Sequence, residues 1–147
     1  YRLFFYLRFC ICRTDFYKCM QKLNVEKWQY KDLYGSVELA EVGFDIDVYY
    51  IKLYADFVDQ LDLFKRGEFK EYVYSDIVDS VDVFSIAKVE EEKYQLCYSG
   101  KNITLNKYTL YRLLSTYIKE FQNLCWGYGE KGQRLLHEIF IDVLTIK

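Results

Sequence analysis

Carboxylates are the most numerous side chains in this sequence that could do chemistry, and sixteen of the 22 fall in residues 32–100. A glycosidase-type reaction needs an acid and a base held on opposite sides of a cleft, and no spacing in the sequence establishes such a pair. Calcium loops use the spacing D-x-D-x-D-G, whereas Asp76, Asp79 and Asp82 are three residues apart. The acids therefore predict neither a catalytic pair nor a calcium loop.

Histidine and cysteine offer few candidates for nucleophilic catalysis. His137 is the only histidine, and proton transfer near neutral pH usually depends on this residue type. A Cys–His pair with Cys97 or Cys125 lacks any local signature, so we interpret His137 as a structural residue of an amphipathic helix. No catalytic residue is predicted.

The other three cysteines, Cys10, Cys12 and Cys19, are close together near the N-terminus. Structural zinc sites pair C-x₂₋₄-C units, which this spacing does not form, so no metal and no cofactor are predicted. An odd number of five cysteines without regular spacing is also not a disulfide framework. It favours a reducing compartment, and we expect the cytoplasm.

Glycines at 127, 129 and 132 spell G-x-G-x-x-G. The dinucleotide motif follows a strand, so that the ligand's phosphates lie at the N-terminus of the next helix. Here a helix is expected before the glycines and only fifteen residues follow them, which leaves no room for a βαβ unit. We interpret the segment as a connection between two helices.

Charge is strongly partitioned along the chain. Residues 1–31 carry seven basic and two acidic side chains. Residues 32–100 carry six basic and sixteen acidic side chains, and residues 101–147 carry seven basic and four acidic ones. An acidic segment of net charge −10 would speed encounter with a basic partner, and tyrosines exposed beside it would anchor the contact. A plain solvated surface is the alternative. The predicted partner-binding residues are Asp45, Asp47, Tyr49, Tyr72, Tyr74, Asp76, Asp79, Asp82, Glu90, Glu91 and Glu92.

Nucleic acid and membrane are not expected partners. The basic segments lack the clustered Lys/Arg-with-aromatic pattern of a nucleic-acid binder, although Arg112, Lys119, Lys131 and Arg134 could form a short basic strip. The apolar stretch 1–11 falls short of the roughly 20 residues that a membrane helix needs.

The elements that must hold these residues follow from the apolar pattern. Residues 44–50 alternate, with Asp45, Asp47 and Tyr49 on the face opposite the apolar side chains. The spacing then predicts a helix over 53–64 with Gly67 as its C-terminal cap. Strands are expected at 69–74, 81–89, 94–98 and 103–105, with turns at 90–92 and 99–102, followed by a helix capped by Asn106 and a last helix after Gly132.

Strands in series with helices at the ends predict the α+β class, with an antiparallel sheet and two or three helices packed on one face. Residues 20–147 are expected to form a single domain. Residues 1–19 are an apolar, Cys-rich leader that could be a leading strand, a fragment edge or translated upstream sequence.

The order of elements from Phe44 to Phe121 resembles the small immunity proteins of bacterial polymorphic-toxin systems. The stretches that carry the resemblance are Phe44–Val48 leading into a helix that ends Phe64–Gly67, and Leu105–Leu110 opening a later helix. The resemblance covers about half of the chain. It implies a non-catalytic protein that neutralises a toxin by binding it.

Two functions are therefore predicted. The first is a small binding protein, such as an immunity protein, that covers a basic surface on a protein partner. The alternative is a viral or mobile-element accessory protein whose acidic face mimics nucleic acid and inhibits a nucleic-acid-binding machine.

Overall fold

The computed structural model describes residues 7–146 of the chain, with side chains described as far as residue 142. Its strands form two antiparallel sheets, ordered β1-β2-β3 and β4-β5-β6-β7. The predicted α+β class with antiparallel strands is confirmed. The elements are β1 (Phe9–Ile11), α1 (Arg13–Lys22), η1 (Val25–Lys27), β2 (Tyr34–Leu39), β3 (Phe44–Tyr49), α2 (Tyr50–Lys65), β4 (Glu71–Ser75), β5 (Asp82–Glu90), β6 (Lys93–Tyr98), β7 (Lys101–Asn106), α3 (Lys107–Gly127) and α4 (Glu130–Ile146).

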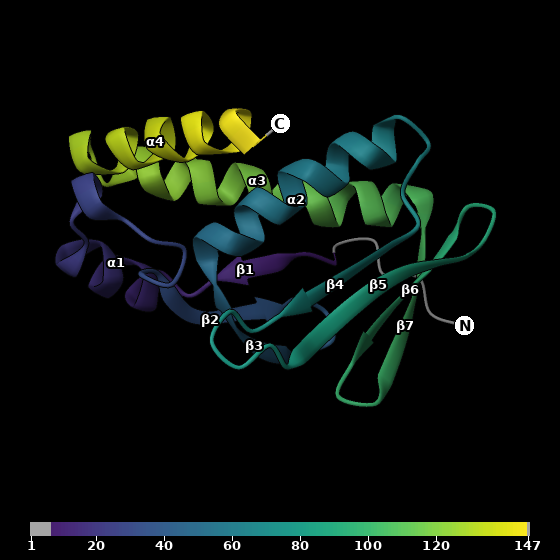
Figure 1. Ribbon diagram of the computed structural model, residues 1–147. Coiled ribbons are helices and arrows are strands. Elements are labelled where there is room, and N and C mark those ends of the chain that lie inside the picture. The colour runs from purple at the N-terminus through teal and green to yellow at the C-terminus, as the bar shows by residue number, and fades with distance from the viewer. Residues whose placement is uncertain (1–6, 147) are drawn as a thin grey trace.

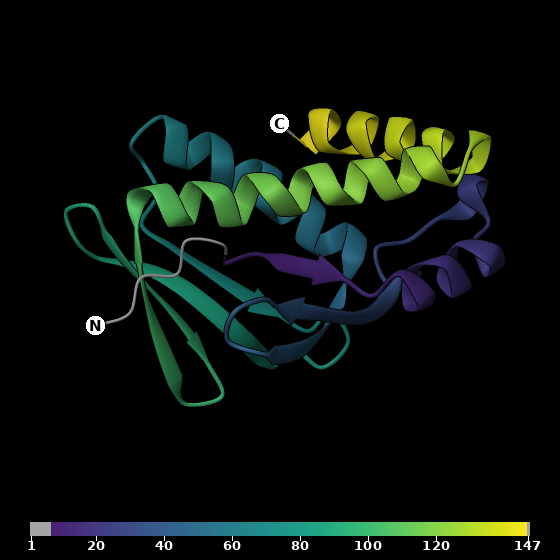
Figure 2. The ribbon, with the colours of Figure 1, turned by 180° about the vertical axis from the view of Figure 1, so that it is seen from behind.

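The long helices share one side of the strands. Figure 1 shows α2 and α3 above both sheets and α4 stacked against α3 on the outer side. Seen from behind, α3 runs from the end of β7, past β1, to the end at which α1 lies (Figure 2). Among the described residues, no helix is both long and apolar enough to cross a lipid bilayer.

The segment before Met20 belongs to the core in its described part. β1 pairs with β2, and the side chains of Phe9 and Phe16 are fully buried. The ring of Phe9 lies 5.9 Å from that of Phe57 in α2 and 5.4 Å from that of Phe84 in the second sheet. Residues 7–19 therefore join the two sheets to the helices, while residues 1–6 lie outside the described part.

α1 is fastened to β2 at a point that only glycine allows. A Cβ atom on Gly35 would lie 2.4 Å from the hydroxyl of Tyr50 and 2.6 Å from the Cβ of Asp15. The Asp15 carboxylate accepts the N–H of Ser36 at 3.1 Å, and the Tyr50 hydroxyl donates to the Ser36 carbonyl at 2.8 Å. This close approach holds the N-terminal elements in place.

Both predicted caps are confirmed. Gly67 has φ +72°, and its N–H and that of Glu68 donate to the carbonyls of Phe64 and Leu63, which is a Schellman ending of α2. The Asn106 side chain accepts the N–H of Thr109 at 2.8 Å at the start of α3.

The glycine motif is a connection between two helices, as predicted. Gly129 has φ +86° in the tight turn between α3 and α4. A Cβ atom on Gly132 would lie 1.9 Å from the carbonyl oxygen of Cys125, so α4 begins in direct contact with the α3 backbone. The motif serves helix packing.

Candidate functional site

The turn between β4 and β5 is built by its own carboxylates. Asp76 accepts the N–H groups of Val78 (2.8 Å) and Asp79 (3.3 Å), and Asp79 accepts the N–H of Val81 (3.0 Å). Asp82 accepts the hydroxyl of Ser75 at 2.7 Å. Each of the three carboxylates accepts a hydrogen bond from a nearby backbone N–H or hydroxyl group. These bonds hold the three acids in place at one exposed turn.

β3 adds further acids beside this turn. The pKa of Tyr34 is raised by partial burial and by nearby carboxylates, those of Asp47, Asp76 and Asp79 among them. The negative charges of the strand and of the turn therefore act on the same side chain. We call Asp47, Asp76, Asp79 and Asp82 the acidic face. Asp45 is exposed as well, but it lies two residues nearer the start of β3, where its carbonyl accepts the hydroxyl of Tyr98.

Apolar side chains are exposed within this acidic face. Val78 is 73% exposed and Val81 is 59% exposed, and both lie between the turn's carboxylates in the sequence. Protein contact surfaces commonly have an apolar centre surrounded by a polar rim. The acids could be identified from the sequence, whereas the exposure of these two valines was not predicted.

The expectation that Tyr49, Tyr72 and Tyr74 are exposed is wrong. All three are buried, and the hydroxyl of Tyr74 accepts the N–H of Tyr49 at 2.8 Å. Tyr72 donates to the carboxylate of Asp56 at 2.7 Å. The tyrosines are buried because α2 covers β4, and Tyr49 is covered by the ring of Tyr34, whose centroid lies 4.6 Å away.

The predicted contact residues divide into two groups. Glu90, Glu91 and Glu92 lie at the β5–β6 turn, at the opposite end of β5 from Asp82. A nine-residue strand spans about 26 Å, so this glutamate cluster is separated from the acidic face. Of the three, Glu91 forms an ion pair with Lys88 at 3.0 Å.

His137 and Cys125 lie on different helices, α4 and α3. His137 is exposed on α4 and lines a groove with Tyr54 and Trp126. Cys125 is buried in α3, and burial raises the pKa of its thiol to about 12, which leaves it protonated at neutral pH. Within residues 7–142, no group of three His, Cys, Asp or Glu side chains is placed to hold a metal ion.

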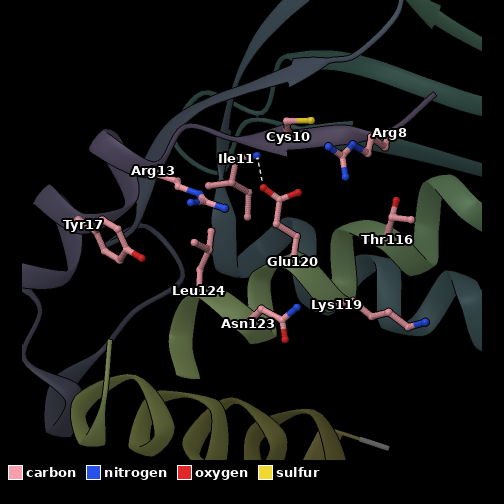
Figure 3. A pocket seen from close by; sticks show the side chains of 10 residues that line it. All are labelled: Arg8, Cys10, Ile11, Arg13, Tyr17, Thr116, Lys119, Glu120, Asn123 and Leu124. Atoms are coloured by element: carbon pink, nitrogen blue, oxygen red, sulfur yellow. Dashed lines mark hydrogen bonds between the residues drawn. The ribbon is translucent and has the colours of Figure 1, made fainter. Parts of the chain in front are cut away.

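A pocket that the sequence did not indicate lies between the N-terminal elements and α3 (Figure 3). Its charged groups come from the two basic ends of the chain: Arg8 and Arg13 flank β1, and Lys119 and Glu120 belong to α3. These residues are more than a hundred positions apart, so only the fold brings them together. Of the four residues of the predicted basic strip, Lys119 lines this pocket and the other three do not. Lys131 donates to the carbonyl of Met20, and Arg134 forms an ion pair with Glu26.

Comparison of the chain with protein-family models, with curated proteins and with solved structures finds no match.

Proposed function

We propose that the chain is a non-catalytic binding protein that docks onto a basic surface of a protein partner through the acidic face. The observation that carries the proposal is the exposure of Val78 and Val81 among the carboxylates of a hydrogen-bonded turn. The valines supply apolar contact area, and the acids supply long-range attraction and orientation.

The fixed shape of the turn supports the same proposal. Because Asp76 and Asp79 hold the backbone of the turn, that backbone loses little conformational freedom when a partner binds. The turn connects two strands of a four-stranded sheet, which is a rigid support for a binding loop.

In its most concrete form, the proposal is that the protein is an immunity protein. The acidic face would cover a basic surface that a toxin uses on its own target, and the toxin would be blocked by steric and electrostatic occupation. The partner's nucleic acid would compete for that surface if the toxin is a nuclease.

The test is a change of charge that keeps the turn intact. We would capture the partner from the host with the wild-type protein and then measure association with the triple variant Asp76→Asn, Asp79→Asn and Asp82→Asn. Asparagine keeps the accepting oxygen of each side chain, so the turn's hydrogen bonds persist while three charges are lost. The association rate at low salt should fall about tenfold and depend less on ionic strength.

The matched control removes three charges from the other end of β5. The variant Glu90→Gln, Glu91→Gln and Glu92→Gln has the same net charge as the first and should change the association rate by less than about twofold. An equal fall in the association rate of both variants would show that net charge alone matters. An unchanged rate in the Asp76, Asp79 and Asp82 variant would place the docking surface elsewhere.

A further inference from the structure

The pocket between β1, α1 and α3 is a concave feature that lies outside the acidic face. It has a volume of about 580 Å³, which lies in the range of pockets that bind small molecules. One wall is the β1–α1 segment and the other is a single face of α3 (Figure 3). The residues that line it are Arg8, Cys10, Ile11, Arg13, Tyr17, Thr116, Lys119, Glu120, Asn123 and Leu124.

Positive charge is in excess in this pocket. Figure 3 shows the guanidinium groups of Arg8 and Arg13 on either side of the Glu120 carboxylate. No ion pair within the described residues uses Arg8, Arg13 or Lys119. Three cations and one carboxylate leave a net charge of +2 when Glu120 is ionised.

Glu120 is held in position by the backbone. One of its carboxylate oxygens accepts the N–H of Ile11 at 2.8 Å, which fastens α3 to β1. Burial raises the pKa of this carboxyl group, and the hydrogen bond and the two arginines oppose that rise.

The polar and apolar walls suit different parts of one ligand. Arginine forks bind phosphate oxygens through paired hydrogen bonds, and a lysine adds a point charge. Tyr17 and Leu124 line the pocket as well, and the Tyr17 ring stacks on that of Tyr128 at 5.7 Å, which holds it in place. We propose that this pocket binds a phosphate-bearing small molecule of nucleotide size, with its phosphate between the arginines.

This proposal does not depend on the acidic face. The pocket lies against α1 and α3, and none of its lining residues belongs to β3 or to the β4–β5 turn. A failure of either proposal would therefore leave the other standing.

The experiment is isothermal titration calorimetry of the full chain with pyrophosphate, ADP and adenosine. Pyrophosphate and ADP should bind with a Kd in the micromolar range, and adenosine should bind far more weakly. Equal binding of adenosine and ADP would overturn the phosphate assignment. The absence of binding of pyrophosphate and ADP at millimolar concentration would overturn the proposal as a whole.

Three single variants locate the binding. Arg13→Gln should raise the Kd for ADP about tenfold or more, because one charge-assisted pair is lost. Arg134→Gln makes the same change of charge at an exposed side chain outside the pocket, and it should raise the Kd for ADP by less than about twofold. Glu120→Gln keeps the acceptor for Ile11 and should lower the Kd, because it removes the only negative charge of the pocket. Equal effects of Arg13→Gln and Arg134→Gln, or weaker binding by Glu120→Gln, would contradict the assignment.

Discussion

At the scale of single residues, buried tyrosine hydroxyls connect the layers of this protein. Tyr74 of β4 accepts a backbone N–H of β3 and so bridges the two sheets, and Tyr117 of α3 donates to the carbonyl of Tyr50 at the start of α2, at 2.9 Å. Burial raises the pKa of Tyr74 and of Tyr117, so both stay protonated at any physiological pH. Tyrosine is common at binding surfaces, but here its hydroxyl is a structural group.

The two bridges are expected to differ in strength. Tyr74→Phe leaves the buried N–H of Tyr49 without an acceptor and should lower the free energy of unfolding by about 1–3 kcal/mol. Tyr117→Phe should lower it by only about 1 kcal/mol, because the Tyr50 carbonyl keeps its helical hydrogen bond. Urea denaturation of both variants measures the difference, and equal losses would show that the N–H of Tyr49 finds another partner.

At the scale of elements, the pattern of residues 44–146 predicted each strand and helix but not all of their bounds. α2 begins at Tyr50 and not at 53, α4 begins at Glu130 and not after Gly132, and β7 includes residues 101 and 102, which were expected to form a turn. Alternation of apolar and polar residues predicted β3, β5 and β6, and the 3.6-residue period of apolar residues predicted α2 and α3. Gly67 marked the C-terminal end of α2, and Asn106 marked the N-terminal end of α3. A leading strand was one of three alternatives for residues 1–19, and α1 and β2 were not predicted. β1 could not be decided from the sequence, because a three-residue strand carries almost no periodicity and its partner β2 lies about 30 residues further along the chain.

The helix connection permits a matched pair of substitutions. Gly132→Ala places a methyl group against the Cys125 carbonyl and should lower the free energy of unfolding by about 1–3 kcal/mol as α4 is pushed from α3. Gly127→Ala meets only the Tyr17 hydroxyl at 3.9 Å in the last turn of α3 and should raise that free energy by about 0.4–1 kcal/mol. Thermal unfolding of both proteins tests this, and a neutral Gly132→Ala would show that α4 moves without cost.

At the scale of the whole molecule, the fold brings together charged residues that lie in separate segments of the sequence. Arg8 and Arg13 from the basic N-terminal segment and Lys119 from the basic C-terminal segment line one pocket, and Asp47, Asp76 and Asp79 of the middle segment act on the same tyrosine, Tyr34. The acids could be identified from the sequence because they are close in it. The pocket could not, since Arg8 and Lys119 become neighbours only when β1 lies against α3.

The described part of the segment before Met20 should be essential to folding. A chain of residues 20–147 lacks β1 and most of α1, and with them the fully buried Phe9 and Phe16. Loss of a buried phenylalanine side chain costs about 3–5 kcal/mol, and a domain of this size is stable by about 5–15 kcal/mol in total. We expect the shortened chain to show no cooperative thermal transition by circular dichroism.

Single substitutions in the full chain distinguish the effect of losing buried side chains from the effect of shortening the chain. In the full chain, Phe9→Ala should lower the free energy of unfolding by about 3–5 kcal/mol, because the cavity opens between α2 and both sheets. Val78→Ala, at a side chain 73% exposed, should change it by less than about 0.5 kcal/mol. If residues 20–147 unfold cooperatively at the temperature of the full chain, β1 and α1 are dispensable and the pocket they form is not a built part of the domain.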